Sequence, residues 1–298
     1  MNDFRKLMEA ISEKYNQLLG KNLIGIYVHG SIAFDCFHWD RSDIDFIVVI
    51  HKPIPQPTKL QLLQVLADLK AQAPPRGFEM SIVLEKYCKA FVHKNFVAGS
   101  NTPRNSCASA SAADSDKSPA IPVLRSSAPA PAVRKFIYPT PYELNFSSGW
   151  NERYLSKQLA LREDERRDAD LAAHFMVIKH VGLVIYGAPI EDVFGAVPRE
   201  AYIDSICKDL VSAKEYIADD PGYIVLNLCR AYAYISGGLV LSKEQGGKWG
   251  LENLPQKYHN LISAMLGNYV NGSAFANDEA QRIQFVAYML ELILGKTT

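Results

Sequence analysis

The sequence lacks an excess of charge of either sign. Its 298 residues contain 32 Lys and Arg and 32 Asp and Glu, so the formal net charge at pH 7 is zero. Proteins that neutralise many duplex phosphates are normally basic, and we therefore expect no nucleic acid among the partners. Hydrophobic residues make up 48% of the chain, which is enough for a buried core and excludes wholesale disorder.

Long apolar runs and patterned cysteines are also missing. No stretch reaches the ~18 uncharged apolar residues of a membrane span, and the longest candidate, residues 171–186, contains His174, Lys179 and His180. Residues 1–20 have an amphipathic pattern that contains Asp3, Glu9 and Glu13, unlike a signal peptide. The five cysteines form no CxxC pair, which disfavours a disulfide frame or a zinc finger. These absences predict a soluble cytoplasmic protein without a membrane partner.

Helix and strand patterns alternate over the first 90 residues. Apolar residues recur at helical spacing over residues 4–19 and 58–70. Short buried strands are predicted at 23–28, 43–50 and 78–84. This order is typical of a small α/β domain, which we place at residues 1–91 with a mixed sheet.

The composition changes after this region. From Ala98 to Arg134, 22 of 37 residues are Ala, Ser or Pro and none is aromatic. Such a segment cannot bury enough apolar surface to offset its ordering entropy, so residues 92–134 are expected to be a disordered insertion. Residues 135–298 are expected to form an all-helical bundle, which gives an α+β fold overall. Its clearest helices are predicted at 170–186, 221–235, 254–266 and 278–294.

Three acidic side chains stand on the predicted strands. Asp43 and Asp45 open the second strand and point to the same face, ~6–7 Å apart at a rise of ~3.3 Å per residue. Glu79 can add a third carboxylate from the next strand; Glu85 shares its face but lies ~20 Å further along. Clustered carboxylates repel one another and suit Mg²⁺. Surface strand residues and salt-bridge partners are the alternative interpretation.

A Gly-Ser pair follows the first predicted strand. Gly30 allows a tight turn and close approach of the backbone to a phosphate, to which the Ser31 hydroxyl can donate. A plain turn with a helix cap is the alternative. A phosphate held by amides and by a metal, with a carboxylate beside it, is suited to in-line nucleotidyl transfer.

Other polar residues have weaker signals. Arg230 lies in a nearly apolar helix, where a guanidinium needs an anionic partner such as phosphate or carboxylate. Lys243 lies in a predicted loop near several glycines. The sequence favours structural roles for His29 and His38, and a core or surface position for His174.

Several segments of this chain are similar to the aminoglycoside (3'')(9) adenylyltransferases, within the DNA polymerase β-type nucleotidyltransferase superfamily. The superfamily pattern of apolar strand, Gly-Ser and Asp-apolar-Asp stands here at residues 28–31 and 42–46. The resemblance extends through FEMSIV, YELNFSSGW and IVLNLCRAYAYISGGLVLSKEQGGKWGLENLP, and covers nearly the whole chain except residues ~92–134. It implies an N-terminal nucleotidyltransferase domain and a helical domain that enclose ATP, Mg²⁺ and the drug between them.

The resemblance also implies the activity and the nucleotide site. AMP would pass from ATP to a hydroxyl of an aminoglycoside or aminocyclitol, which confers antibiotic resistance. Asp43, Asp45 and Glu79 would ligate magnesium, and Glu79 would also accept the hydroxyl proton. The residues implied for the nucleotide are Gly30, Ser31, Ser42, Arg230 and Lys243.

For the drug, the resemblance implies contacts with Trp150 and Asp220. Trp150 could instead pack between the domains, and Asp220 could be an ordinary helix start, with Asp219 as an alternate contact. The tryptophan and acidic residue that family members use for streptomycin have no counterpart, since the aligned stretch reads Val211 to Tyr216. Spectinomycin is therefore favoured over streptomycin, and a monomer is expected.

Two other functions remain open at this point. One is a nucleotidyltransferase of the same fold that modifies a protein or an RNA end. The other is an inactive relative that only binds nucleotide. Loss of a carboxylate would indicate the inactive relative, and all three carboxylates are present.

Overall fold

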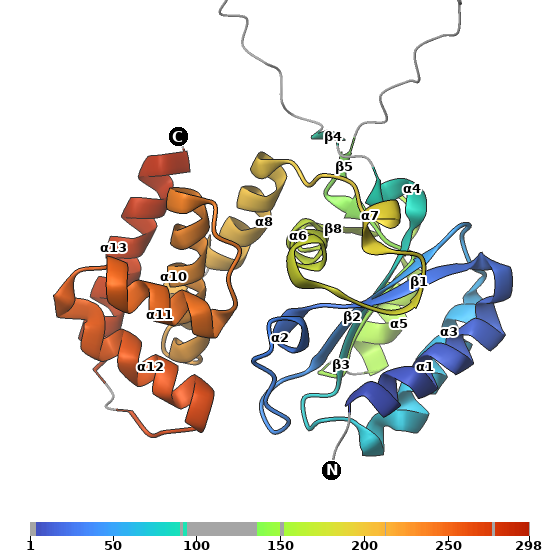
Figure 1. The fold of residues 1–298 in the computed structure, drawn as a ribbon, viewed down its shortest axis with the longest axis horizontal. Coiled ribbons are helices and arrows are strands. Elements are labelled where there is room, and N and C mark those ends of the chain that lie inside the picture. The colour runs from blue at the N-terminus through green and yellow to red at the C-terminus, as the bar shows by residue number, and fades with distance from the viewer. Residues whose placement is uncertain are drawn as a thin grey trace, which may run out of the picture.

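The computed structural model describes residues 4–89, 92–93, 136–149, 152–211, 213–275 and 278–297. Within these ranges the chain forms a sheet with helices on both faces, beside a bundle of helices (Figure 1). The predicted α+β fold, with a mixed sheet followed by a helical region, is confirmed. Trp150 and most of the expected disordered insertion at 92–134 lie outside the described residues. The insertion was predicted to begin too early, because Val92–His93 form a short strand, β4, that pairs with Ile137–Tyr138.

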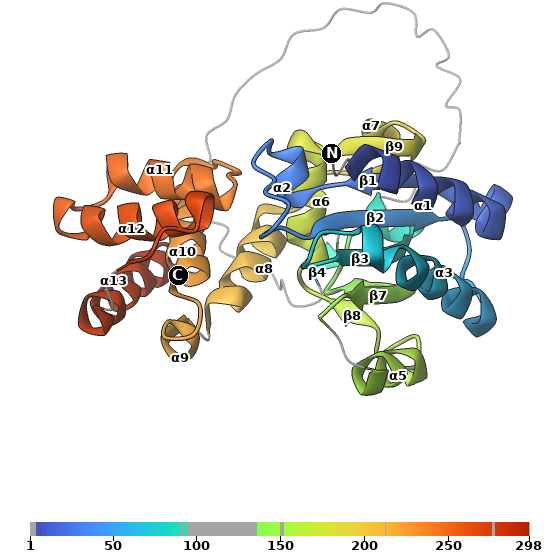
Figure 2. The same cartoon turned by 90° about the horizontal axis from the view of Figure 1, so that it is seen from below.

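The sheet has five strands in the order β7–β3–β2–β1–β9, which Figure 2 shows side by side. Their bounds are β1 Leu23–Val28, β2 Ile44–Ile50, β3 Phe78–Leu84, β7 Leu144–Ser147 and β9 Leu183–Gly187. β2 and β3 are parallel, and the other neighbours are antiparallel. The parallel register pairs Asp45 directly with Glu79, which fixes the centre of the candidate site.

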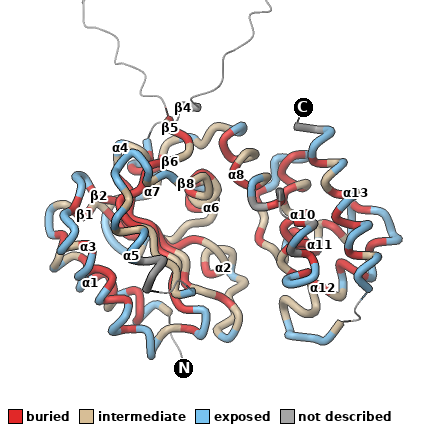
Figure 3. The backbone as a smooth tube through the Cα atoms, turned by 180° about the vertical axis from the view of Figure 1, so that it is seen from behind, coloured by how far each residue is buried: buried red, intermediate tan, exposed pale blue. Residues whose placement is uncertain are grey.

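Helices cover both faces of this sheet because its central strands are apolar on both sides (Figure 3). Phe46 and Val48 pack against α1 (Phe4–Leu19) and α3 (Gln56–Leu69). Ile47 and Val49 point to the opposite face, towards α6 (Leu171–Val181) and α7 (Ile190–Val193). Alternation along each strand therefore builds two separate cores.

The helical bundle has its own apolar core around Leu226, Cys229 and Phe285. Its long helices are α8 Arg199–Val211, α10 Pro221–Gly237, α11 Lys243–Asn253, α12 His259–Asn271 and α13 Glu279–Thr297. The central helix α10 begins at a Pro in its first turn and ends at Gly238, whose φ is +72°. The expected helix at 221–235 is thus present with the predicted end signals.

Short elements complete the described chain. They are α2 Gly30–Ala33, α4 Glu85–Cys88, β4 Val92–His93, β5 Ile137–Tyr138, β6 Thr140–Pro141, α5 Glu152–Ala160, β8 Arg167–Asp168 and α9 Ala213–Tyr216. Among the described helices, none combines the length and apolarity required to cross a bilayer.

One predicted helix is wrong in its second half. Residues 170–186 were expected to be a single helix, but α6 ends at Val181 and β9 follows. Gly182 turns the chain into an extended conformation, and its amide caps the helix by donating to the Ile178 carbonyl at 2.8 Å. The β-branched residues beyond it then pair with β1 as an edge strand. The prediction that residues 135–298 are all helical is therefore wrong, because β7 and β9 of the five-stranded sheet and three short strands lie in this part of the chain.

The surroundings of Lys243 were also predicted incorrectly. Lys243 was expected in a loop, but it is the first residue of α11. Ser242 caps this helix, since its hydroxyl accepts from the Gln245 amide and the Gln245 side chain accepts from the Ser242 amide. The helix at 254–266 begins later than expected, at His259, after Pro255.

Candidate active site

The three predicted carboxylates converge at one end of the parallel strand pair. Asp43 immediately precedes β2, Asp45 lies in β2, and Glu79 lies opposite Asp45 in β3. One oxygen from each carboxylate lies within 4.8 Å of the others, and all three side chains are partly buried. Among the described residues, acidic, His and Cys side chains that could together hold a metal ion are found in this group. Hard oxygen donors at this spacing suit Mg²⁺.

Electrostatic repulsion in this cluster also favours a cation. Burial and the carboxylates of Asp43 and Glu79 raise the pKa of Asp45 well above its ordinary value. Burial likewise raises the pKa of Glu79, with Asp43 and Asp168 acting in the same direction and His174 opposing them. A divalent ion would relieve this repulsion, so the carboxylates fit the predicted metal.

The raised pKa of Asp45 predicts a pH-dependent stability effect in the metal-free protein. An acid with a raised pKa in the folded state destabilises folding at neutral pH. This effect fades as pH falls through the raised pKa and is gone below the ordinary Asp value of about 3.9. In EDTA at pH 7.5, Asp45→Asn should raise Tm by about 2–6 °C, which corresponds to about 1–2 kcal/mol in a chain of this length. Thermal melts should show the gain shrinking towards pH 4; a gain that grows on acidification would contradict this cause.

The Gly-Ser turn lies directly beside the carboxylates. Gly30 has φ +63°, and a Cβ at this position would collide with the Asp45 carboxylate. The Ser31 hydroxyl is buried and has no hydrogen-bond partner among the described residues. Ser42 has a structural contact already, because its hydroxyl accepts from the His38 amide at 3.1 Å. The predicted roles of all three residues in nucleotide binding remain predictions.

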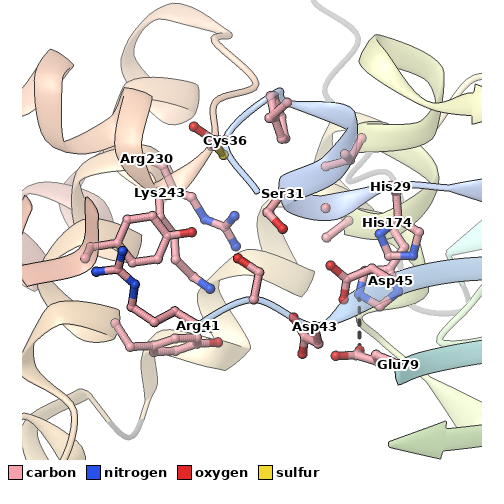
Figure 4. Close-up of a pocket in the computed structure, with 18 of the residues that line it drawn as sticks. His29, Ser31, Cys36, Arg41, Asp43, Asp45, Glu79, His174, Arg230 and Lys243 are labelled. Carbon is pink, nitrogen blue, oxygen red and sulfur yellow. Dashed lines mark ion pairs between the residues drawn. The ribbon is translucent and has the colours of Figure 1, made fainter. Parts of the chain in front are cut away.

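Two cations reach the same cavity from the helical bundle. Arg230 comes from α10 and Lys243 from the start of α11, and both point across the cavity towards the sheet (Figure 4). Burial and the neighbouring Arg230 lower the pKa of Lys243, while Asp45 and Asp43 oppose them. The Lys243 ammonium also lies over the ring of Tyr223, 4.6 Å from its centroid. An anion between the two sides would be attracted by these cations.

The cavity between sheet and bundle has a volume of about 430 Å³. Gly30, Ser31, Ser42, the carboxylate trio, Arg230 and Lys243 all line it. Asp220 lines it too, but its side chain also caps α10 by accepting from the Tyr223 amide at 2.9 Å. Asp220 therefore has a structural role as the N-cap of α10, whereas its predicted drug contact stays a prediction. The predicted contact of Trp150 falls outside the described residues.

His174 lies in this site although the sequence favoured a core or surface position. Its Nε2 lies 3.9 Å from a Glu79 oxygen, shown by the dashed line in Figure 4. Its ring stacks on buried His29 with centroids 4.5 Å apart. Burial and His174 lower the pKa of His29 well below its ordinary value. The available signal was helical spacing, since Asp170, His174 and Val177 share the cavity-lining face of α6.

The comparisons with known proteins agree with this geometry. Residues 192–291 match the family model of the aminoglycoside adenylyltransferase C-terminal domain. Spectinomycin 9-adenylyltransferases of Staphylococcus aureus strains Mu50 and N315 are 20% identical to this chain over 256 residues. Each alignment covers 85% of this chain and 80% of the relative.

A crystal structure of spectinomycin adenyltransferase AAD(9) from Enterococcus faecialis with ATP and spectinomycin is similar over nearly the full length. The TM-score is 0.67 at 17% sequence identity, with 97% of this chain and 98% of that chain covered. The likeness shows that the two chains share a fold. The chain is thus similar to the aminoglycoside adenylyltransferases in sequence and in fold, as the resemblance of its motifs predicted.

Proposed function

We propose that this protein transfers AMP from ATP to a hydroxyl of an aminoglycoside or aminocyclitol antibiotic, with spectinomycin favoured over streptomycin. The main observation in support is that three carboxylates of the sheet and two cations of the bundle line one cavity. The names of the relatives, spectinomycin adenylyltransferases, favour the same acceptor. In this proposal a monomer acts in the cytoplasm on small molecules, and the activity confers resistance.

The chain's own residues would hold the nucleotide from both sides. Arg230 and Lys243 would bind the triphosphate from the bundle, and the free hydroxyl of Ser31 would donate to it from the Gly30 turn. Asp43 and Asp45 would hold Mg²⁺, which supplies charge neutralisation at the phosphates when bound. Together these contacts would orient the α-phosphate towards Glu79.

Glu79 would act at the acceptor hydroxyl. Its carboxylate would accept the hydroxyl proton while the hydroxyl oxygen forms a bond to the α-phosphorus. The bond from the α-phosphorus to the bridging oxygen of the β-phosphate would break, and pyrophosphate would leave in line. Lys243 and Arg230 would stabilise the negative charge of the leaving group.

Acidic residues around the cavity favour a cationic acceptor. Asp170 at the start of α6 lines the cavity from the side of the sheet, and Asp220 at the start of α10 lines it from the bundle. Carboxylates in a cleft attract amines such as those of aminocyclitols. The same arrangement repels an RNA backbone, which makes a nucleic-acid acceptor the weaker alternative.

An acceptor panel tests this function. The full chain is incubated with ATP labelled at the α-phosphate, Mg²⁺ and one of spectinomycin, streptomycin, total RNA or a protein extract. We expect label on spectinomycin, with less or none on streptomycin. Label found only on RNA or only on protein would show that this macromolecule, and not an antibiotic, is the acceptor. Nucleotide binding without transfer to any acceptor would indicate an inactive relative.

A further inference from the structure

Arg41 connects the two parts of the molecule beside the candidate site. It lies in the loop between α2 and β2, directly before Ser42 and Asp43. Its guanidinium donates to the carbonyl of Val270 at 2.6 Å and more weakly to that of Asn268 at 3.4 Å. Both carbonyls belong to the last turn of α12 in the helical bundle, so these hydrogen bonds join residues more than 220 positions apart in the sequence.

The contact is electrostatically favourable. The last carbonyls of a helix have no intrahelical partner and carry the negative end of the helix dipole. Arginine suits this position because its planar guanidinium presents several donors at fixed angles and remains charged. Arg41 therefore satisfies the Val270 carbonyl at the end of α12, whereas the Asn268 carbonyl also accepts from the Gly272 amide at 2.8 Å.

Both ends of this contact adjoin the cavity. On the sheet side the residues after Arg41 are Ser42 and Asp43, and on the bundle side Asn268 and Tyr269 line the cavity. The backbone of the loop has its own hydrogen bonds, since the amides of Arg41 and Ser42 donate to the His38 carbonyl at 3.0 and 2.8 Å. The guanidinium is thus not needed to form the turn, and its contribution is the link to α12.

We propose that Arg41 is a positioning residue that fastens the loop carrying Ser42 and Asp43 to the end of α12, and so sets the distance between the carboxylates and the cations of the bundle. The inference rests on the proposed function, because it assumes that a nucleotide is bound by residues from both the sheet and the bundle. Without the link, Lys243 and Arg230 would face the carboxylates at variable distances. MgATP binding would then weaken. Arg41 also lines the cavity, so the effect on the link is measured without nucleotide as well.

Arg41→Gln tests this role against Arg162→Gln. Arg162 is a suitable control because it is exposed and pairs with Asp164 within its own loop. Titration calorimetry should show MgATP binding weakened about tenfold in Arg41→Gln, as expected for loss of a charge-assisted hydrogen bond, and unchanged in Arg162→Gln. Arg41→Lys should have an intermediate affinity for MgATP, since an ammonium keeps the charge but lacks the several donors at fixed angles of a guanidinium. Wild-type affinity in Arg41→Gln would overturn the proposal.

A second pair of variants perturbs the same contact from the bundle. Gly272 ends α12 with φ +69°, and a Cβ there would lie 3.3 Å from Arg41 Nη1. Gly238 ends α10 with φ +72° and has nothing within 4 Å of such a Cβ. Gly272→Ala and Gly238→Ala therefore share the backbone strain, but only the Gly272→Ala substitution places a side-chain atom close to the Arg41 guanidinium. We expect weaker MgATP binding in Gly272→Ala than in Gly238→Ala, and equal affinities would contradict the proposal.

Hydrogen exchange separates this inference from the proposed function. In Arg41→Gln without nucleotide, the amides of residues 38–45 and 267–273 should exchange faster than in the wild type, whereas Arg162→Gln should leave them unchanged. Unchanged exchange in both segments of Arg41→Gln would refute the link itself. If the wild type does not bind MgATP while exchange rises as expected, the link stands and the nucleotide function fails.

Discussion

Asp45→Asn is expected to reduce AMP transfer about 10³-fold or more while leaving the protein folded. Asp45 is at the centre of the cluster, opposite Glu79 in the register of β2 and β3 and in contact range of Asp43. An amide is a poor magnesium ligand at this position, and metal stabilisation of transferring phosphates is worth several kcal/mol, at 1.36 kcal/mol per factor of ten. The measurement is kcat with saturating ATP and spectinomycin, alongside circular dichroism.

The matched control for this substitution is Asp68→Asn. Asp68 is exposed on α3, where its carboxylate accepts from Gln64 at 2.7 Å. Its loss should leave kcat unchanged. An Asp45→Asn variant that is folded and retains wild-type turnover would refute the assignment of the carboxylate cluster to catalysis.

Glu79→Gln should lower kcat by about 10²–10⁴-fold, the range that general base catalysis contributes. The glutamine keeps the size of the side chain but cannot accept the hydroxyl proton. If Glu79 acts as the base, the affinity for MgATP should change little. If it mainly ligates magnesium, the affinity for MgATP should fall together with kcat. Measuring both quantities distinguishes the two roles implied for this residue.

Glu85→Gln is the control for Glu79→Gln. Glu85 follows the same strand, six residues further along, and binds Lys89 at 2.6 Å and His51 at 3.2 Å at the opposite end of the sheet from the site. These contacts are exposed or partly exposed and contribute little. Turnover at the wild-type rate in Glu79→Gln, or an equal loss in Glu85→Gln, would be incompatible with a specific role for Glu79.

Local pattern was sufficient to predict the elements that centre the site. The helix at 4–19 and the strands at 23–28 and 78–84 have the predicted bounds. Each has apolar residues at the spacing of its secondary structure and clear residues at its ends. The spacing from Asp43 to Asp45 predicted a shared face, and the structure brings both together with Glu79. Alternation along one strand is a local property, so it can be derived without knowing the tertiary fold.

The missed elements depend on tertiary context. Residues 183–187 are as apolar as the helix before them, and only pairing with β1 selects the strand. Three glycines within α11 disfavour a helix by propensity, but all three are buried where the helix lies against its neighbours. Packing at these positions overrides the intrinsic preference of the backbone.

The site residues that the sequence analysis missed also depend on tertiary contacts. His174 and Arg41 carry no motif, and they reach the site because α6 packs across the sheet and α12 ends beside the loop before β2. Their partners, Glu79 and Val270, are distant in sequence. A single sequence contains no periodicity that links such pairs, so their roles become visible only in the folded chain.

The most direct measurement is the mass of spectinomycin after incubation with the full chain, ATP and Mg²⁺, together with the pyrophosphate released. The proposed function predicts that the drug gains one AMP, with one pyrophosphate formed for each drug molecule modified and neither product formed in EDTA. Spectinomycin of unchanged mass, in the presence of a chain that binds MgATP, would contradict it.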